Sequence, residues 1–582
     1  MAAIIINLSD IHHTYFDKPV LTGLSWEIQA GQKIGLVGPN GGGKSTLLKL
    51  ILGRLQGDGG TIFRLRGLTI GYLPQEVTPD ALAGEAEVAG EAAGLTILEA
   101  ALSGSPEIAR LRHDLTLKEA QMGDPAVFGN ERRLARVLDD HARALHAYEA
   151  AGGLTYENRV RSTLRDLGLG EETFDQPVRT LSGGQAKLVG LARLMVWAPD
   201  VLLLDEPDNH LDLDGKARIE KLVRGYAGSV IIVSHDRYLL DQTVDTIAEL
   251  VRGQITVWPG TYSNYAINKQ LAELRQEQLY RAQQKRIGQI EAAIKRFEEA
   301  AAFTENERHA RQARHRHKML ERMDKIERPQ EQGRMRLELG GWRGSNKVLD
   351  VQRVDKWFED WATGNLRVVL EGASFQVWHG ERVGLVGPNG AGKSVLFRCI
   401  LGASHLAEDG AGLQPPAGGA ADARSLFEQP DGGVIKLGPS VRIGYYSQQH
   451  ETLHGDWTLV EEIRATRPMY ETDAVAILQR FLFDYYAAQK QVHHLSGGER
   501  SRLQLAKLML SDVNFLMLDE PTNNLDIPSS EVLESALEEF NGTVLVISHD
   551  RYFLDRIVDR VVVLEEGTVR EIAGGYSDYA GD

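Results

Sequence analysis

The chain has 582 residues, of which 42% are hydrophobic and 25% charged, and its formal net charge is −16. This length predicts two to four domains of ordinary globular composition. No apolar run approaches the roughly 18 residues that a membrane-spanning helix needs. Cys399 is the single cysteine, which excludes an intramolecular disulfide and any cysteine-ligated zinc or iron–sulfur site. The N-terminus lacks the pattern of a signal peptide, so we expect a cytoplasmic protein.

The first motif in chain order is a glycine-rich loop between an apolar strand, IGLV, and an apolar helix, STLLKLIL. Backbone N–H groups of such a loop face an anion at the helix N-terminus. Lys44 would reach the β- and γ-phosphates of a nucleotide, and Ser45 would supply an oxygen to Mg²⁺. We therefore predict an ATP site formed by Gly38, Pro39, Asn40, Gly41, Gly42, Gly43, Lys44, Ser45 and Thr46.

Two longer stretches follow this loop. Residues 81–94 are rich in glycine, alanine and glutamate and are interpreted as a loop. Residues 106–152 are compatible with helix except near MGDPAVFGN. They predict an inserted helical arm, about residues 105–152, that projects from the first domain.

Three motifs complete the first set: LSGGQ (Leu181 to Gln185), LLLDEP and SHDR. The run LLLD is typical of a parallel strand buried on both faces. Asp205 at its end would hold Mg²⁺ through water, and Glu206 is the candidate general base or water-positioning residue. LSGGQ precedes a helix, whose N-terminus would be a second site for an anion. A single domain needs only one such site to bind its own nucleotide.

A helical linker follows, from about Pro259 to Gly340. Its apolar residues recur every three to four positions, which is typical of a seam between two helices. A break near Ala300 to Asn306 predicts an antiparallel hairpin that ends at Pro329. The seam consists of Leu271, Leu274, Ile287, Ile290, Ile294, Phe297, Met319, Met323 and Ile326.

This linker is basic although the whole chain is acidic. From Lys269 to Arg336 there are 17 Lys/Arg and 11 Asp/Glu, and Arg308 to Lys318 contains five Lys/Arg, three His and no acid. One interpretation is that this basic tip attracts a polyanion. The alternative is a solvated helix whose charged residues form ion pairs with residues four positions away on the same helix. Interleaved arginines disfavour a metal site at the three histidines. The predicted RNA-facing residues are Arg308, Arg311, Arg314, Arg316 and Lys318.

The second half repeats the motifs in the same order, as GPNGAGKSV, LSGGE, LMLDEP and SHDR. Ser182 and Ser496, and likewise Glu206 and Glu520, are 314 positions apart, so this region is duplicated without a net insertion. Residues 412–433 are rich in Gly, Pro and Ala and are interpreted as a surface loop. The repeated loop is Gly387, Pro388, Asn389, Gly390, Ala391, Gly392, Lys393, Ser394 and Val395, with Asp519 and Glu520 repeating the acidic pair. Val395 stands where the first copy has Thr46, which predicts a modest asymmetry between the sites.

Together these motifs resemble the ATP-binding cassette superfamily. The resemblance implies an α/β fold with two P-loop ATP-binding cassette domains, each a mixed sheet core plus a helical subdomain, joined by an α-helical hairpin linker. It also implies two ATP molecules sandwiched between the domains. Lys44 and Ser496 would line one site, and Lys393 and Ser182 the other.

The same resemblance implies roles for further residues. His235 and His549 match the switch histidine that contacts the γ-phosphate, and Tyr15 and Trp357 match the aromatic residue that stacks on adenine. The D-loops are DNHLD, residues 208–212, and TNNLD, residues 522–526, and Asp208 replaces the more usual Thr at the start of the first. The implied Mg²⁺ ligands, partly through water, are Ser45, Gln75, Asp205, Ser394, Gln448 (or its neighbour Gln449) and Asp519. The implied signature residues at ATP are Ser182, Gly183, Gly184, Gln185, Ser496, Gly497, Gly498 and Glu499.

The complete architecture resembles the ABC-F family, and the segments WPGTYSNYAINK and HKMLERMDKIERP match that family's linker. The resemblance implies a first cassette at 1–258, a linker at 259–340 and a second cassette at 341–582. It implies an ATP hydrolase that uses ATP and Mg²⁺ in cycles of ribosome binding and release. Its partners would be ribosomal RNA and tRNA, without a membrane or an obligate protein subunit. Such proteins act as translation factors or protect ribosomes from antibiotics.

The sequence departs from the ABC-F pattern in two ways, and two alternative functions remain. The loop near 410–433 is longer than the family pattern, and the chain ends soon after GGYSDYAGD, without the basic coiled-coil tail of some members. A DNA-binding ABC-F ATPase is one alternative. The ATPase subunit of a transporter is the other, although such a subunit has no use for a basic hairpin between its cassettes.

Overall fold

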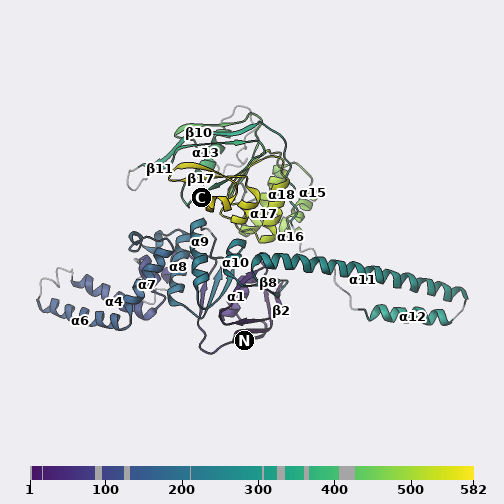
Figure 1. Ribbon diagram of the computed structural model, residues 1–582, viewed down its shortest axis with the longest axis horizontal. Coiled ribbons are helices and arrows are strands. Elements are labelled where there is room, and N and C mark those ends of the chain that lie inside the picture. Colours follow the sequence, from purple (N-terminus) through teal and green to yellow (C-terminus); the bar gives the residue numbers. More distant parts are fainter. Residues whose placement is uncertain are drawn as a thin grey trace.

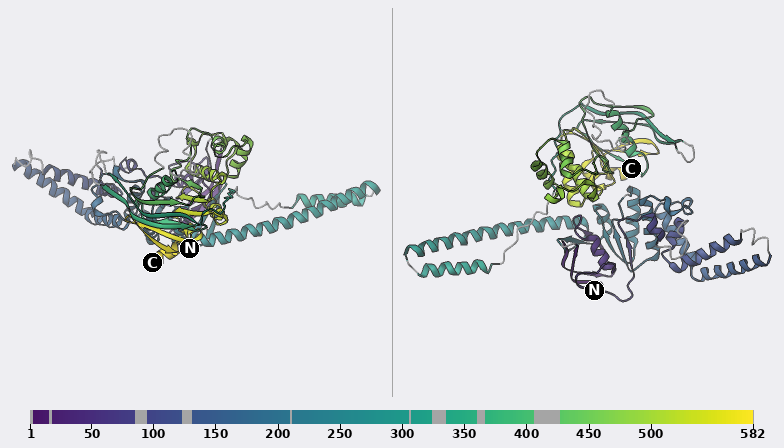
Figure 2. Two further views of the ribbon diagram at one scale, coloured as in Figure 1. Left: turned by 90° about the horizontal axis from the view of Figure 1, so that it is seen from above. Right: turned by 180° about the vertical axis from the view of Figure 1, so that it is seen from behind.

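The computed structural model describes residues 3–15, 18–84, 95–122, 131–209, 211–304, 307–323, 335–359, 366–405 and 427–581. Two α/β bodies lie one above the other, and two helical arms project from the lower body in opposite directions (Figure 1). The same arrangement is seen from above and from behind (Figure 2). No helix in these described ranges is long and apolar enough to cross a membrane.

The first cassette is built on a six-stranded sheet, and a small antiparallel sheet lies beside it. The large sheet is parallel except for its last pair, and its central strands are fully buried, as their continuous apolar sequences predict. Its order is β5 (Ile70–Leu73), β6 (Val201–Asp205), β7 (Ser229–Val233), β3 (Lys33–Val37), β8 (Thr246–Val251) and β9 (Gln254–Pro259). The small sheet has the order β2 (Lys18–Gln29), β1 (Ile4–Tyr15) and β4 (Gly59–Arg64).

The second cassette repeats both sheets in the same order. Its large sheet is β14 (Ile443–Tyr446), β15 (Phe515–Asp519), β16 (Thr543–Ile547), β12 (Arg382–Val386), β17 (Arg560–Glu565) and β18 (Thr568–Ala573). Its small sheet is β11 (Leu366–Trp378), β10 (Lys347–Glu359) and β13 (Gly432–Leu437). The expected fold class, two cassettes of mixed sheet plus helices joined by a helical linker, is confirmed.

The helices cover these sheets and position the motifs. In the first cassette they include α1 (Lys44–Leu52), α3 (Ile97–Leu102), α7 (Gly153–Asp166), α8 (Gly183–Trp197), α9 (Leu213–Gly225) and α10 (Arg237–Thr243). In the second they include α13 (Lys393–His405), α14 (Leu459–Thr466), α15 (Glu471–Arg480), α16 (Tyr485–Ala488), α17 (Gly497–Leu510), α18 (Ile527–Glu539), α19 (Arg551–Ile557) and α20 (Tyr576–Gly581). Cys399 on α13 is fully buried, as a core residue.

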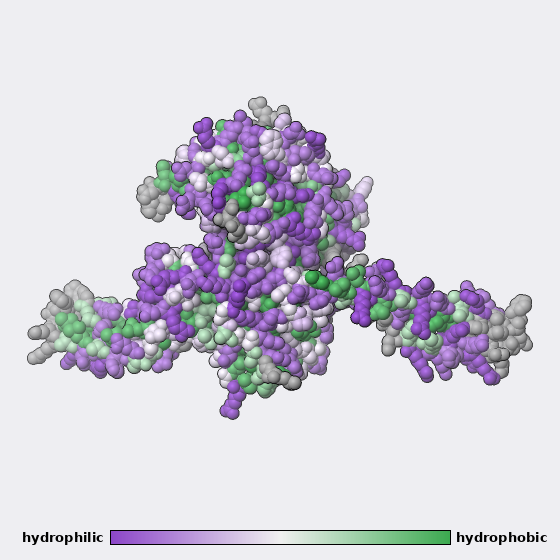
Figure 3. Space-filling view, viewed as in Figure 1, coloured by the Kyte–Doolittle hydropathy of each residue, from purple (hydrophilic) through white to green (hydrophobic). Residues whose placement is uncertain are grey.

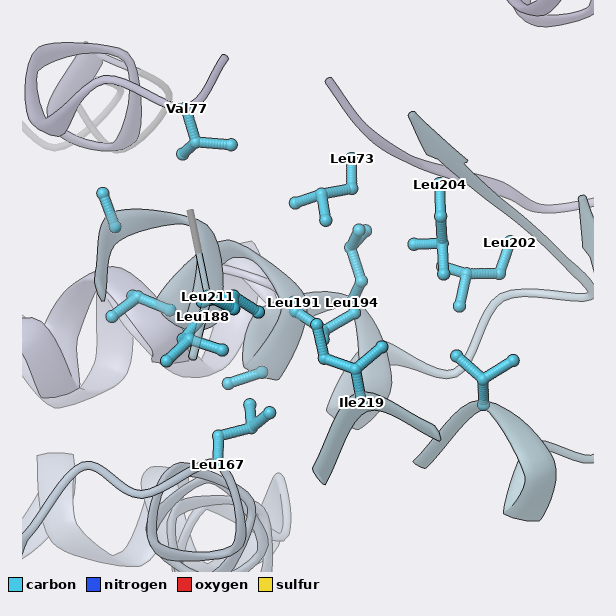
Figure 4. Packing of buried hydrophobic residues seen from close by; sticks show 14 of the residues in the cluster. Leu73, Val77, Leu167, Leu188, Leu191, Leu194, Leu202, Leu204, Leu211 and Ile219 are labelled. Carbon is cyan, nitrogen blue, oxygen red and sulfur yellow. The ribbon is translucent and has the colours of Figure 1, made fainter. Parts of the chain in front are cut away.

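Helix α8 is the centre of the largest core of the first cassette. Its leucines Leu188, Leu191 and Leu194 lie between the sheet residues Leu202 and Leu204 and the neighbouring helices (Figure 4). Because the helix is apolar on most of its circumference, it is buried on all sides and joins the helical part to the sheet. Helix α8 begins at the LSGGQ motif, so this packing fixes where that motif points.

The arm inserted in the first cassette consists of α4 (Pro106–Met122) and α6 (Glu131–Ala150). Their contact includes Ile108, Leu115, Ala144 and Tyr148. The break expected near MGDPAVFGN falls mostly on residues outside the described ranges. Residues 81–84, which we interpreted as part of a loop, instead end the short helix α2 (Pro79–Gly84), with Leu82 buried against the core; the rest of that stretch, 85–94, is not described.

The linker forms α11 (Tyr262–Thr304) and α12 (Glu307–Glu321), two helices that lie side by side (Figures 1 and 2). The expected seam is closed only in part of its distal half, where Met319 of α12 is still 40% exposed. The side chain of Phe297 and residue Ile326 lie outside the described set. Ile294 is buried, but Leu271 and Leu274 are 59% and 50% exposed. The reason is length, because α12 is much shorter than α11 and covers only its distal part. Hydrophobic surface is visible where α11 leaves the body (Figure 3).

The other expected loop, residues 412–433, is described only from Phe427 onward. There Lys356 Nζ contacts Glu428 and Asp431 at 3.3 and 3.4 Å, and β13 begins at Gly432. This end of the stretch is therefore fixed to the second cassette.

Candidate nucleotide-binding sites

Each phosphate loop adopts a backbone that only glycine tolerates. Gly43 has φ 95° and Gly392 has φ 100°. A Cβ on either would lie 2.6 Å from a valine, Val20 in the first cassette and Val369 in the second. Both glycines directly precede the helix that begins at the lysine of the motif, so the strand, loop and helix N-terminus come together as the sequence predicts.

The two lysines point into their own loops. Lys44 Nζ donates to the carbonyls of Gly38 and Pro39 at 2.9 and 3.2 Å, and Lys393 makes the equivalent bonds. Burial lowers the pKa of Lys44 although Glu206 works in the opposite direction. Each ammonium is thus held where a phosphate of ATP would replace its carbonyl partners.

The acidic pairs follow the buried strands β6 and β15. Asp205 Oδ1 and Asp519 Oδ1 are buried and have no hydrogen-bond partner. The hydroxyls of Ser45 and Ser394 lie near these aspartates and act to lower their pKa values. A buried carboxylate oxygen without a partner beside a serine hydroxyl fits a Mg²⁺ site, because hard cations prefer oxygen ligands. Burial raises the pKa of Asp519 to about 6, which a bound cation would reverse.

Both candidate catalytic glutamates have a strained backbone. Glu206 and Glu520 each have φ 50°, a region that non-glycine residues rarely occupy. Their amides donate to the carbonyls of Val233 and Ile547 at 2.8 and 2.9 Å. Strain that recurs at equivalent positions of two domains is typical of functional sites.

The switch histidines lie beside these glutamates. His235 Nε2 is 3.6 Å from Glu206 Oε1, and His549 Nε2 is 3.4 Å from Glu520 Oε1. Burial and the nearby Lys44 lower the pKa of His235 to about 3, and burial and Lys393 lower that of His549. Both rings are therefore neutral. Both nitrogens of His235 and Nδ1 of His549 are buried without a hydrogen-bond partner and would be available to a nucleotide.

The glutamines that we expected near Mg²⁺ follow equivalent strands. Gln75 lies two residues after β5, and its Nε2 donates to Glu206 Oε2 at 2.8 Å. Gln448 lies two residues after β14 and lines the second site. This register favours Gln448 over the alternative Gln449.

The structure corrects one aromatic assignment. Tyr15 pairs with Lys18 two residues before Val20, and Phe358 pairs with Arg367 two residues before Val369. Phe358, not Trp357, therefore occupies the position of Tyr15. Phe358 also lines the second site.

The signature serines cap helices. Ser182 and Ser496 are the N-caps of α8 and α17, and Gln185 and Glu499 complete the two capping boxes. A Cβ on Gly498 would lie 3.1 Å from Asn40 Nδ2. The signature of the second cassette thus faces the phosphate loop of the first, as the resemblance implied.

The D-loop aspartates join the two cassettes, a role that sequence reasoning missed. Asp526 accepts from the amide of Asn40 at 3.1 Å, and Asp212 accepts from the amide of Asn389 at 3.1 Å. Each aspartate is also the N-cap of the helix that follows it. A cavity of about 510 Å³ lies between the cassettes at the second site, with Lys393, Glu520 and His549 on one side and residues of the first cassette on the other.

Two buried ion pairs also cross between the cassettes. Arg237 pairs with Glu534, and Arg551 pairs with Glu220. The arginines belong to the two SHDR motifs, and their partners lie on α18 and α9. All four residues are at most 8% exposed, and Glu534 is fully buried. The switch loops are therefore part of the interface.

The basic stretch lies on α12, at the far end of the linker hairpin. Arg311 and Arg314 are exposed, whereas His317 Nε2 contacts Glu298 of α11 at 3.2 Å. The side chain of Arg308 is outside the described set. No group of three or more His, Cys, Asp or Glu within the described residues could hold a metal ion.

Comparison with known proteins agrees with this geometry. A family model described as ABC transporter matches residues 21–209 and 370–523, and a second with the same description matches residues 248–339. The putative ATP-binding protein YdiF of Bacillus subtilis is 34% identical, over 99% of this chain and 82% of its own. The energy-dependent translational throttle protein EttA of Escherichia coli K12 is 33% identical, over 97% and 92%.

Two further comparisons place the fold. ABC transporter F family member 5 of Arabidopsis thaliana is 31% identical, over 99% of this chain and 77% of its own. In a crystal structure of an archaeal complex of the ribosomal stalk protein aP1 with the recycling factor aABCE1, one chain has a TM-score of 0.58 at 19% identity, covering 98% of this chain and 92% of that one. This last likeness concerns the fold alone.

Duplicated phosphate loops, signature helices and acidic strands define a tandem ATP-binding cassette ATPase. Within that class, the chain belongs to the ABC-F family.

Proposed function

We propose that this ATPase hydrolyses ATP at two composite sites and uses the cycle to bind and release ribosomes, as a translation factor or a ribosome-protection protein. Relatives whose names refer to translation, at 33% identity over 97% of the chain, support this target. The observation that carries the proposal is the basic hairpin, which projects far from the cassettes and presents Arg311 and Arg314 at its distal part (Figure 1). A projecting basic hairpin suits contact with ribosomal RNA or tRNA.

The site residues divide the work at each composite site. Lys44 and the loop amides would bind the phosphates of ATP, and Gly498 and Ser496 of the opposite cassette would close over them. Ser45, Asp205 and Gln75 would hold Mg²⁺ in the first site, as Ser394, Asp519 and Gln448 would in the second. The cation would neutralise charge on the transferring phosphoryl group.

The remaining residues would act on the attacking water. Glu206 would orient it and accept its proton, and neutral His235 would contact the γ-phosphate; Glu520 and His549 would do the same in the second site. Tyr15 and Phe358 would stack on the two adenines. Because each site is completed by the other cassette, ATP favours the closed arrangement.

The test uses Glu206→Gln together with Glu520→Gln. Loss of both water-positioning carboxylates should lower ATP turnover by at least about 10²-fold while ATP stays bound. The closed protein should then co-sediment with ribosomes in the presence of ATP. The matched control, Lys44→Ala with Lys393→Ala, removes phosphate binding and should not sediment.

Failure of the Gln variant to sediment, with ATP shown to be bound, would contradict ribosome binding. Retention on duplex DNA in place of ribosomes would instead support a DNA-binding member of the family.

A further inference from the structure

Among the residues that differ between the cassettes are two that lie at their interface. The first D-loop has Asp208 where the second has Thr522, and helix α9 has Lys216 where α18 has Ser530; both pairs are 314 positions apart. The first cassette thus carries an extra acid and an extra base that the second lacks. Both are buried, at 4% and 8% exposure.

Lys216 is charged and surrounded by carboxylates. Its Nζ donates to Asp236 Oδ2 at 2.9 Å. Although burial works against it, Asp236, Asp208 and Asp550 raise the pKa of Lys216. A buried acid such as Asp208 needs a nearby cation, which explains why the two changes occur together. Asp208 and Lys216 therefore interact electrostatically, and Asp236 is the carboxylate to which Lys216 is bonded.

The same ammonium reaches the other cassette. Lys216 Nζ donates to the backbone carbonyl of His549 at 2.8 Å. The amide of His549 in turn donates to Glu520 Oε2 at 3.3 Å, and its ring lies beside Glu520 Oε1. Lys216 also lines the cavity of the second site. One side chain of the first cassette thus fixes the peptide that carries the second switch histidine.

The glutamate of the first site is held by residues of its own cassette. Glu206 Oε2 accepts from Gln75 at 2.8 Å and from Asn209 at 2.5 Å, both of its own cassette. Ser530, in the place of Lys216, has a far shorter side chain. In the part of the chain that the structure describes, no hydrogen bond joins it to His235.

We propose that Lys216 is a positioning residue of the second ATP site only. It holds the backbone of His549, and through it Glu520, in the arrangement that hydrolysis needs, and it does so only while the cassettes are in contact. Hydrolysis at the second site is thereby tied to cassette closure by a contact that the first site lacks. The inference rests on the proposed pairing of the composite sites.

The experiment exchanges the pair for the residues of the other cassette. Asp208→Thr with Lys216→Ser removes one acid and one base together, so the net charge of the interface does not change. Asp236, which loses its bond to Lys216, keeps Arg551 at 3.9 Å. The exchange is combined with Glu206→Gln, so that only the second site hydrolyses ATP. In a separate protein it is combined with Glu520→Gln, so that only the first site hydrolyses ATP. The control is Lys221→Ser, an exposed lysine on the same helix.

We expect the exchange to lower the ratio of second-site to first-site kcat about tenfold, because misplacing a catalytic group by a fraction of an ångström has large effects on rate. Loss of folded protein would lower both rates together and leave the ratio unchanged. Lys221→Ser should not change the ratio. Lys216→Arg, which keeps a donor and a charge, should recover part of the loss.

A ratio that stays within twofold after the exchange would overturn the role of Lys216 and leave the proposed function intact. Turnover in both single Gln variants no higher than in the double Gln variant would overturn the two-site assignment itself, and this inference with it.

Discussion

At the scale of single residues, backbone register decides which aromatic side chain lines the second site. Trp357 and Phe358 are neighbours in sequence and both are about 40% exposed, but successive residues of a strand point to opposite faces. Only Phe358 lines the second site, in register with Tyr15. A shift of one position therefore changes the assignment completely.

This correction gives a direct test. Phe358→Ala in the Lys44→Ala background, which removes phosphate binding at the first site, should weaken ATP binding at the second site about tenfold, since stacking of a base on an aromatic ring contributes roughly 1–3 kcal/mol. The matched control, Trp357→Ala, should change the Kd less than twofold. Equilibrium titration with a fluorescent ATP analogue measures both. A larger effect from Trp357→Ala would restore the original assignment.

At the scale of elements, the starts of α10 and α19 act as reciprocal contacts between the cassettes. Arg237 and Arg551 each cross to a buried glutamate of the opposite cassette. The Arg551 guanidinium also lies 4.1 Å from the ring centre of Tyr238. Because these arginines follow the switch histidines by two residues, cassette closure and histidine position are mechanically joined.

A double-mutant cycle measures this contact. Arg237→Met and Glu534→Gln should each weaken ATP-driven closure, and their coupling should exceed about 1 kcal/mol, as for residues in one buried ionic contact. The exposed pair Arg442–Asp512, at 2.6 Å, is the control and should couple by only a few tenths. Closure is measured by fluorescence energy transfer between one label on each cassette, with the substitutions placed in the Glu206→Gln, Glu520→Gln variant. Additive effects at Arg237 and Glu534 would show that the contact does not operate in the closed state.

At the scale of the whole molecule, the basic hairpin is rooted where the two cassettes meet. The amide of Ser263, at the start of α11, donates to Asp241 of α10 at 2.7 Å, and its Oγ lies 3.1 Å from the hydroxyl of Tyr552 on α19. Tyr262 and Tyr265 are buried against the first cassette. Movement of one cassette against the other would therefore be transmitted to the arm.

The tip of that arm can be tested by charge reversal. Changing Arg308, Arg311, Arg314 and Arg316 to Glu should reduce RNA-dependent stimulation of ATP turnover several-fold at low salt, and less at high salt, because screening already weakens the attraction. Turnover without RNA should not change. Stimulation that survives at low salt would contradict a polyanion-facing tip.

The control for net charge lies on the other arm. Changing Arg110, Arg133, Arg136 and Arg143 to Glu alters the total charge equally, far from the hairpin (Figure 1). An equal loss of stimulation in this variant would show that total charge, rather than the tip, is responsible.

The sequence by itself determined the fold class, the ATPase chemistry and the family. These three conclusions follow from local sequence patterns, such as a glycine-rich loop between a strand and a helix. Such patterns predict the same structure and chemistry wherever they occur in this fold. Repetition of the set at a constant spacing, from Ser182 and Ser496 to His235 and His549, made the assignment specific. The helical character of both arms likewise follows from local periodicity.

Only the tertiary structure decided which residues that are far apart in the sequence lie in contact. It placed Phe358 rather than Trp357 at the second site, left Leu271 and Leu274 uncovered because α12 is short, and joined Lys216 to the carbonyl of His549, which is 333 positions away. The physical reason is that register, relative helix length and contacts between domains depend on packing over the whole chain. No local pattern around Lys216 reveals that it reaches the other cassette.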